Sequence, residues 1–322
     1  MSALQADRLV WERDGMNWPH REASRFVNAA GLRWHVQVFG EPDPAKPALL
    51  LLHGTGSSTH SWRGLAPLLA DHFTVLAPDL PGHGFTAMPQ GGTMSPQLSL
   101  PGMARAVNGL LGEMGIRPGV VVGHSAGAAI AVRMCLDSML APQQVVSLNG
   151  ALLPLGGLAG QVFSPVARLM AATSVVPKLF SWRASDPAVL HRLIAGTGST
   201  LDAQGMALYG QLVRNPGHAA GALGMMANWD LPTLSHQLLR LNTPLQQVVG
   251  ENDRTLSPRQ AHRVRAMLPA ASQLPVITLK GLGHLAHEER PDLVARLLLD
   301  LRASTHDSSM PAMASAQPVD QG

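Results

Sequence analysis

The sequence feature that most constrains the fold is the pentapeptide GHSAG at residues 123–127, which fits the pattern G-x-S-x-G. An apolar run at residues 119–122 precedes it, and small and apolar residues at 128–132 follow it. The first run predicts a buried strand, and the second predicts the start of a packed helix. A serine on a sharp strand-to-helix turn projects its hydroxyl from the sheet edge, and small neighbours let the turn pass close to adjacent chain. The context therefore favours a nucleophilic Ser125 over a chance match in a glycine-rich loop.

Short apolar runs and helix-like segments alternate along most of the chain. Residues 25–39 predict a β-hairpin, because apolar residues alternate after a turn at Gly31. Further apolar runs predict buried strands at residues 48–52, 74–77, 120–122, 145–148, 245–249 and 276–279. Helices are expected at residues 62–70, 100–114, 126–139, 258–268 and 286–302. This alternation predicts an α/β fold, in which helices cover both faces of a mostly parallel central sheet.

The alternation stops between residues 150 and 240, where leucine, alanine, methionine and glycine are frequent. This stretch predicts a helical cap, residues 150–240, inserted into a core made of residues 25–149 and 241–302. The alternative is that the main domain continues through it. Residues 1–24 are expected to form a polar N-terminal extension, and residues 303–322, which are small and polar, a disordered tail.

Composition and charge exclude several classes of function. The formal net charge is +3 and the basic residues are scattered, which argues against a nucleic-acid partner. Cys135 is the only cysteine, so an intramolecular disulfide and a multi-cysteine metal site are excluded. No apolar run reaches the roughly 18 residues of a transmembrane helix, and residues 1–8 lack the design of a signal peptide. We expect a cytoplasmic protein without a cofactor or metal site; peripheral contact with a membrane stays open.

A serine hydroxyl is a weak nucleophile, and it needs a base that is itself oriented by an acid. In folds of this kind the acid and then the histidine follow the serine along the chain. Asp253 lies in the loop after the strand at residues 245–249 and is the expected acid, with Glu251 and Asp230 as alternatives. His284 lies in a glycine-loosened loop before the last helix and is the expected base.

Neighbouring polar residues are expected to have structural and not catalytic roles. His287 is expected in the first turn of the last helix, and its spacing from His284 is only a weak metal pattern. Glu288 and Glu289 are expected to stabilise the N-terminus of that helix. The segment DLPGHG at residues 79–84 is expected to be a structural loop beside the site.

An oxyanion formed during attack on a carbonyl needs two N–H donors. One is expected to be the backbone N–H of Ala126, directly after Ser125. The other is expected in the segment HGTG at residues 53–56, as the backbone N–H of Thr55. These are main-chain groups, so the prediction concerns the position of the backbone rather than the side chains.

Together these segments resemble the α/β-hydrolase superfamily over residues 25–302. The resemblance rests on HGTG at residues 53–56, DLPGHG at 79–84, GHSAG at 123–127, Asp253 and Gly283-His284. It implies that fold and a catalytic triad of Ser125, Asp253 and His284. Serine at the elbow differs from the aspartate that haloalkane dehalogenases and epoxide hydrolases of this superfamily use there.

A narrower resemblance covers nearly the whole chain. The segments that carry it are WPHREASRFV at residues 18–27, GLRWHVQ at 31–37, HGTGSSTHSW at 53–62, LNGALLP at 148–154 and GHLAHEE at 283–289. They resemble the BchO family, the magnesium-chelatase accessory proteins of photosynthetic bacteria. This resemblance implies a role in bacteriochlorophyll biosynthesis, near the insertion of Mg²⁺ into protoporphyrin IX. It also makes magnesium chelatase subunits candidate partners and the photosynthetic membrane a candidate site of peripheral contact.

The composition of the expected cap is compatible with such a role. Four methionines are candidates to line a broad apolar pocket for a porphyrin or Mg-porphyrin, with ordinary cap core as the alternative for each: Met170, Met206, Met225 and Met226. Three histidines are expected at the surface, with axial ligation of a porphyrin-bound Mg²⁺ as the alternative: His191, His218 and His236.

Two hypotheses follow from the sequence. In the first, the chain is an esterase-like serine hydrolase that acts on a hydrophobic ester, with tetrapyrrole esters among the candidates. In the second, it is a non-catalytic accessory protein that binds a porphyrin or docks on the chelatase, and the triad is unused.

Overall fold

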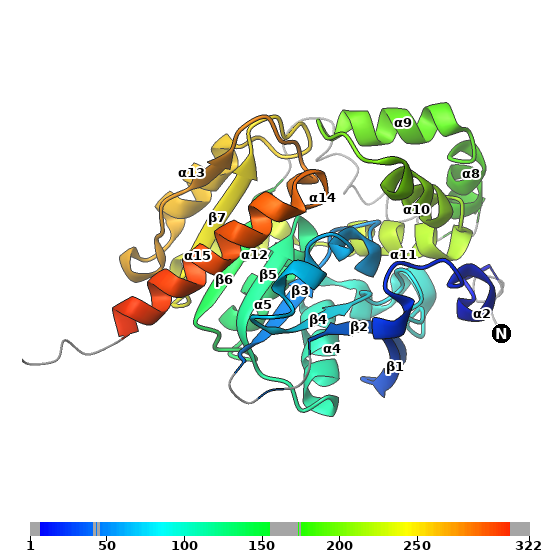
Figure 1. The fold of residues 1–322 in the computed structure, drawn as a ribbon. Coiled ribbons are helices and arrows are strands. Elements are labelled where there is room, and N and C mark those ends of the chain that lie inside the picture. The colour runs from blue at the N-terminus through cyan, green and yellow to red at the C-terminus, as the bar shows by residue number, and fades with distance from the viewer. Residues whose placement is uncertain (1–6, 41–42, 44–45, 155–172, 174, 310–322) are drawn as a thin grey trace, which may run out of the picture.

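The computed structural model describes residues 7–40, 43, 46–154, 173 and 175–309. Within them eight strands form one sheet in the order β1-β2-β4-β3-β5-β6-β7-β8 (Figure 1). The strands are β1 (Ser24–Ala29), β2 (Leu32–Phe39), β3 (Ala48–Leu52), β4 (Thr74–Pro78), β5 (Pro118–His124), β6 (Gln144–Leu148), β7 (Leu245–Gly250) and β8 (Ile277–Leu279). Strand β2 is antiparallel to both of its neighbours, and the remaining pairs are parallel. The α/β-hydrolase fold, with its hairpin and mostly parallel sheet, is confirmed.

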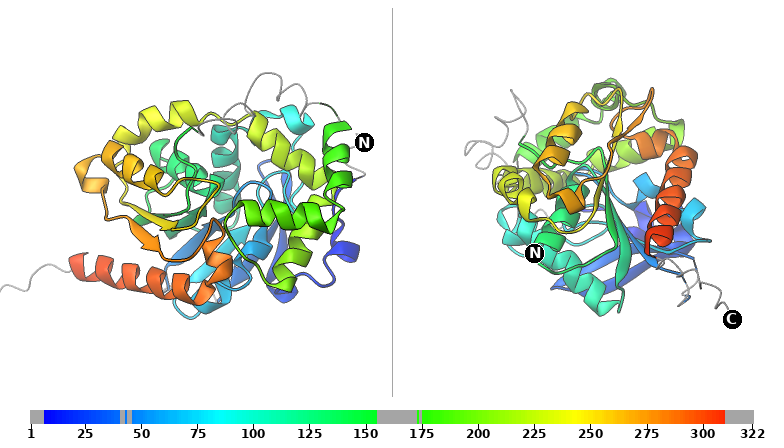
Figure 2. Two further views of the ribbon diagram at one scale, coloured as in Figure 1. Left: turned by 90° about the horizontal axis from the view of Figure 1, so that it is seen from above. Right: turned by 90° about the vertical axis from the view of Figure 1, so that its left-hand side faces the viewer.

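The sheet is buried on both faces, which explains why its central strands are continuous apolar runs. In β3, Leu50 and Leu52 join one core cluster, while Leu49 and Leu51 join the other. The helices on the first face are α4 (Leu100–Glu113), α5 (Ala126–Leu136), α12 (Leu231–Gln237) and α13 (Arg259–Met267), and those on the second are α3 (Ala66–Leu69) and α15 (Pro291–Ser309) (Figure 2). The period of two along a strand thus divides one apolar run between two cores.

Shorter helices occupy the connections. They are α2 (Trp11–Asp14), η1 (Arg21–Ala23), η2 (Thr59–Trp62), η3 (Gly92–Met94), η4 (Pro96–Leu98), η5 (Leu238–Arg240), η6 (Ala270–Ser272) and α14 (Ala286–Glu289). The loops after β3, β5, β6, β7 and β8 all leave the sheet at one edge, because these strands are parallel. That edge is where ligands bind in open α/β sheets, and the predicted site residues lie on these loops.

Helices α8–α11 gather at one end of the molecule, above the edge described (Figure 1). We call them, together with the described segments that join them, the cap: α8 (Val175–Arg183), α9 (Pro187–Gly196), α10 (Ala203–Val213) and α11 (Pro216–Ala227). Three of these helices begin at a residue whose side chain accepts a hydrogen bond from a backbone N–H of the first helical turn: Asp186, Asp202 and Asn215. Residues 155–172 and 174, within the expected cap, lie outside the described residues.

Both ends of the described chain differ from a simple polar extension. Trp18 is 3% exposed, and Trp11 packs edge-on against Phe85 with ring centroids 4.9 Å apart. The Arg8 guanidinium donates hydrogen bonds to the carbonyls of Gly82, Gly84 and Thr86. The segment is therefore a strap over the loop after β4, held by aromatic packing. At the other end, helix α15 continues to Ser309, beyond residue 303, where the tail was expected to begin.

Candidate active site

Ser125 sits on a strained turn between β5 and α5. Its φ of 51° and ψ of −114° lie in a region that L residues rarely adopt. A Cβ at Gly127 would lie 2.0 Å from the carbonyl oxygen of Leu52, and one at Gly123 would lie 2.4 Å from the backbone nitrogen of Ala128. Both glycines of the motif are therefore required by close approach of backbone, and the turn has the geometry of a nucleophile elbow.

The predicted acid and base are hydrogen-bonded to each other. The Nδ1–H of His284 donates to Oδ2 of Asp253 at 2.8 Å. The other carboxylate oxygen accepts the backbone N–H groups of Thr255 at 2.8 Å and Leu256 at 2.9 Å. Because Nδ1 carries the proton in this arrangement, Nε2 is left with the lone pair that a general base needs.

Asn149 is a member of this site that the sequence analysis did not identify. Its side-chain amide donates to Oδ2 of Asp253 at 2.7 Å, so the carboxylate is held from two directions. Asn149 follows β6 with a φ of 46°, a conformation that asparagine tolerates better than most residues. In the sequence, Asn149 could have been recognised only as an asparagine at the carboxyl end of a predicted strand.

The alternative acids lie elsewhere. Glu251 accepts the backbone N–H of Gly281 at 2.9 Å, and Asp230 caps α12 through the backbone N–H and hydroxyl of Thr233. Each has a local structural role at a turn or helix start. Of the three candidate acids, Asp253 is the one that pairs with His284.

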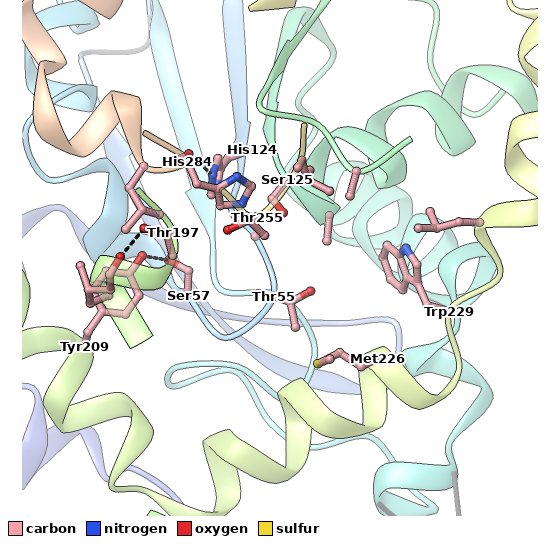
Figure 3. A pocket seen from close by; sticks show the side chains of 17 residues that line it. Thr55, Ser57, His124, Ser125, Thr197, Tyr209, Met226, Trp229, Thr255 and His284 are labelled. Carbon is pink, nitrogen blue, oxygen red and sulfur yellow. Dashed lines mark hydrogen bonds between the residues drawn. The ribbon is translucent and has the colours of Figure 1, made fainter. Parts of the chain in front are cut away.

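A cavity of about 280 Å³ opens over the elbow (Figure 3). Ser125 and His284 line it together with Thr55 and Ala126, the residues predicted to supply the oxyanion donors. Within the described residues no hydrogen bond joins the Ser125 hydroxyl to the His284 ring, a contact that in free enzymes often tightens only in the substrate complex. Ala126 is the first residue of α5, so its backbone N–H has no partner within the helix.

Two buried imidazoles lie behind the base. The Nε2–H of His124 donates to the backbone carbonyl of His284 at 2.9 Å, with ring centroids 4.8 Å apart. His287 follows, its ring centroid 4.5 Å from that of His124 and 4.6 Å from that of Trp62. Burial lowers the pKa of His124 well below its usual value and that of His287 to about 3. Both rings are thus neutral at pH 7, and His284 is the ring of the stack that is paired with a carboxylate.

His218 of α11 is buried, at 2% exposure, and not at the surface as expected. Its Nε2–H donates to the carbonyl of Gly56 at 3.0 Å, and its Nδ1 accepts the N–H of Gly84 at 3.0 Å. Burial lowers its pKa to about 4. The ring therefore joins a cap helix to the loop that carries Thr55 and to the loop after β4.

The cap also reaches between the acid and base loops. Ser199 accepts the backbone N–H of Leu285 on its hydroxyl oxygen at 2.8 Å. Gly198 has a φ of 80°, and a Cβ there would lie 2.0 Å from the carbonyl oxygen of Asn252. The segment before α10 is therefore packed directly against both loops. No local sequence pattern indicated this contact.

Glu288 is not simply a helix-end charge. It accepts a hydrogen bond from Arg63 at 2.7 Å and one from the Tyr209 hydroxyl at 2.7 Å. Burial raises its pKa to about 7, against the opposing effect of Arg63. Glu289 accepts the N–H of Gly283 at 2.8 Å. Both carboxylates thus hold the loop of the base and the cap in place.

The candidate pocket methionines have different positions. Met226 lines the cavity. Met225 is fully buried in the main core, and its sulfur accepts the Thr55 hydroxyl at 3.5 Å. Met206 packs in a smaller apolar cluster with Leu190 and Ile194. Met170 lies outside the described residues.

In the part of the chain that the structure describes, no group of three or more histidine, cysteine, aspartate or glutamate side chains could hold a metal ion. No helix in the same part of the chain is long and apolar enough to cross a bilayer.

The strained serine turn, the acid–base pair and the strand order together define the class of protein. A family model described as the alpha/beta hydrolase family matches residues 49–297, and the chain belongs to this family. The chain is also 37% identical over 286 residues to the magnesium-chelatase 30 kDa subunit of Rhodobacter capsulatus, which covers 88% of this chain and 96% of that protein. The resemblance to the BchO family is thereby confirmed.

Solved structures support the same fold. An alpha/beta hydrolase fold protein from Burkholderia ambifaria superimposes with a TM-score of 0.69 at 24% identity, covering 86% of this chain and 97% of that one. A haloalkane dehalogenase variant from Bradyrhizobium elkanii gives a TM-score of 0.68 at 21% identity, covering 89% and 98%. At these identities the likeness shows the fold alone.

Proposed function

We propose that this protein is a serine hydrolase that cleaves a hydrophobic carboxylic ester. The observation that carries the proposal is the 2.8 Å hydrogen bond from His284 to Asp253 beside a strained Ser125 that lines the same cavity. A structural role alone would not require a serine with positive φ in the lining of an apolar cavity.

The reaction would proceed through an acyl-enzyme. The Ser125 hydroxyl oxygen attacks the ester carbonyl carbon while its proton passes to Nε2 of His284. The tetrahedral intermediate collapses, and the departing alkoxide takes that proton and leaves as the alcohol. Water then attacks the acyl-enzyme, gives its proton to His284, and releases the carboxylic acid as Ser125 regains its hydrogen. Asp253 holds the ring and stabilises the imidazolium in both halves.

The oxyanion of each intermediate would be held by the backbone N–H groups of Thr55 and Ala126. The α5 N-terminus adds a favourable field for that charge. His218 fixes the loop that carries Thr55, because it binds the carbonyl of Gly56.

The similarity to a magnesium-chelatase subunit supports a substrate in bacteriochlorophyll biosynthesis. In a tetrapyrrole ester the ester group stands on a side arm, because the macrocycle itself contains no carboxyl group. The cavity volume of about 280 Å³ is just below the range of about 300–1,000 Å³ for ligand pockets. We propose that the ester arm enters the cavity and that the macrocycle stays at its mouth, where chelatase subunits could deliver or receive it.

A fluorophosphonate probe tests the hydrolase proposal directly. The wild-type protein should be labelled, Ser125→Ala should not be labelled, and His284→Ala should be labelled poorly because the hydroxyl has lost its base. Labelling that persists in Ser125→Ala would assign the reactivity to another residue. Absence of labelling in the wild-type protein would overturn the proposal.

A second candidate function is a non-catalytic accessory role at the chelatase, favoured by the similarity to the magnesium-chelatase 30 kDa subunit of Rhodobacter capsulatus. Pigment synthesis separates the two. A bacteriochlorophyll-producing strain that lacks the gene is complemented with the wild-type gene or with Ser125→Ala. Restoration by both favours the accessory role, whereas restoration by the wild-type gene alone favours the hydrolase.

A further inference from the structure

The cavity has two unlike sides, with Ser125 between them (Figure 3). Met226 and Trp229 line one side and carry no charged group. The other side carries three hydroxyl groups, on Ser57, Thr197 and Tyr209. Apolar pockets with a few placed polar groups bind ligands whose polar atoms match those positions.

Tyr209 is the only tyrosine in the chain, and its proton is committed while Glu288 is ionised, at pH above about 7. The hydroxyl donates to Oε1 of Glu288 at 2.7 Å, and Arg63 holds the other oxygen of that carboxylate at 2.7 Å. A phenol carries a single hydrogen, so the Tyr209 oxygen is left as an acceptor. The Ser57 hydroxyl lies 3.3 Å from it and donates to one of its lone pairs, because the phenol has no second hydrogen to give.

The Thr197 hydroxyl is committed in the same way. It donates to the carbonyl of Ile194 at 2.6 Å and accepts the N–H of Ser199 at 3.3 Å. Its second lone pair, like that of Tyr209, remains for a donor. Two of the three hydroxyls on this side therefore present acceptors, and neither can turn its hydrogen inward without breaking a hydrogen bond of the fold.

The lack of charged side chains in the cavity lining restricts the class of ligand further. Among the described residues that line the cavity there is no aspartate, glutamate, lysine or arginine. Behind the polar side, Arg63 is paired with both Glu288 and Asp202, so its charge is neutralised. A charged group would lose hydration here without gaining an ion pair.

We propose that the polar side, formed by Ser57, Thr197 and Tyr209, is a subsite for an uncharged hydrogen-bond donor of the substrate, a hydroxyl or amide N–H. The substrate class is then an ester with an apolar group on one side of the scissile bond and such a donor on the other. The inference rests on the proposed hydrolase function. A site that offers hydrogen-bond acceptors disfavours a methyl group in place of the hydroxyl, because its remaining acceptor lone pairs are then left without a donor.

Matched ester pairs test the subsite. Each ω-hydroxyalkyl butanoate, with two to six methylenes, is compared with the alkyl ester that has a methyl in place of the hydroxyl, and a second series puts the hydroxyl on the acyl chain. One chain length should show at least about a tenfold preference in kcat/KM for the hydroxylated ester. Tyr209→Phe should reduce that ratio to about 1, mainly through KM. A wild-type ratio near 1 at all lengths would overturn the subsite.

Two further variants serve as a control and as a second test of the subsite. Gln211→Ala lies on the same helix, where its side chain contacts the carbonyl of Asp14, and should keep the wild-type ratio. Thr197→Val, nearly equal in volume, should also lower the ratio and carries the test if Tyr209→Phe fails to fold. An unchanged ratio in a folded Tyr209→Phe or Thr197→Val protein would contradict the assignment of that residue.

Equilibrium binding separates this inference from the hydrolase proposal. Ser125→Ala cannot form an acyl-enzyme, and calorimetry with it measures binding of the same ester pairs. Tighter binding of the hydroxylated ester without hydrolysis by the wild-type protein would support the subsite and overturn the hydrolase proposal. Hydrolysis by the wild-type protein with equal binding and equal kcat/KM would do the reverse.

Discussion

The backbone carbonyl of Thr197 accepts the backbone N–H of His284 at 3.2 Å. The same oxygen accepts the N–H of Arg254, the neighbour of Asp253, also at 3.2 Å. One cap carbonyl thus joins the loops of the acid and the base. The cap is therefore part of the framework that sets the distance between these two side chains, as well as a wall of the cavity.

Gly198→Ala should disturb this framework. The position has a φ of 80°, and the added Cβ would lie 2.0 Å from the carbonyl oxygen of Asn252, so the segment must shift and move Thr197 with it. A displacement of about 1 Å in such a site costs on the order of 10²-fold in rate. We expect a loss of that order in kcat for p-nitrophenyl butanoate, measured on protein whose folding is verified by circular dichroism.

Gly196→Ala is the matched control, because a Cβ there meets no atom within 4 Å. It should keep wild-type kcat. A folded Gly198→Ala protein with wild-type kcat would show that the cap segment does not position the acid and base loops.

The strands and the turn at Ser125 could be predicted because each has a local signature, and the pairing of Asp253 with His284 could be expected from their positions after predicted strands. Continuous apolar runs specify strands buried on both faces, and GHSAG specifies a turn with close backbone contacts. Asn149, Thr197 and Tyr209 had no such signature. Their roles depend on contacts with residues tens of positions away, such as Tyr209 with Glu288, and only the folded chain shows which polar groups meet.

His218 illustrates the same limit. From the sequence a surface position was expected, yet the ring is buried because two backbone groups satisfy both of its nitrogens. The pairing partners, Gly56 and Gly84, have no side chains, so no pattern of side-chain types could indicate the contact. The domain boundaries drawn from the sequence stay a prediction.

His218→Ala should weaken the proposed oxyanion hole. The variant releases the carbonyl of Gly56 and lets the loop of Thr55 move. We expect kcat to fall about tenfold, less than the 10²–10³-fold cost of losing a donor outright. Affinity for an alkyl boronic acid, which mimics the tetrahedral intermediate, should fall in parallel, while KM changes little.

A purely structural role would lower thermal stability and leave boronate affinity per active site unchanged. His236→Ala, an exposed histidine on α12, is the control and should behave as the wild-type protein. Equal boronate affinity in His218→Ala and the wild-type protein would refute the positioning role.

Asp253→Asn should fold and lose most hydrolase activity. The amide can present an N–H to Nδ1 of His284 and so favour the wrong tautomer, a change worth on the order of 10²–10⁴-fold in kcat. Glu251→Gln, which alters the neighbouring loop at a contact with Gly281, should keep activity within about twofold. Rates are compared after titration of reactive serines with fluorophosphonate. Loss in Glu251→Gln with retention in Asp253→Asn would move the acid to Glu251.

Buried neutral histidines should make the fold sensitive to acid. Burial lowers the pKa of six of them: His53, His60, His83, His124, His218 and His287. In the unfolded chain such rings take up a proton near pH 6.5. Their contribution to stability is therefore complete above pH 6.5 and is lost as pH falls toward the folded pKa, because the unfolded state then binds more protons.

His287→Leu should reduce this acid sensitivity and stabilise the protein. With pKa values of 6.5 unfolded and about 3 folded, this ring alone removes about 2 kcal/mol of unfolding free energy between pH 7.5 and pH 5.0. Both of its ring nitrogens are also buried without a hydrogen-bond partner within the described residues. Leucine removes that unmet polar group, so the variant should gain about 1 kcal/mol at pH 7.5 and about 3 kcal/mol at pH 5.0. Urea unfolding at the two pH values measures both gains, with His262→Leu on the exposed side of α13 as the control. Equal losses on acidification in His287→Leu and wild-type protein would mean that the ring is already protonated in the folded state at pH 5.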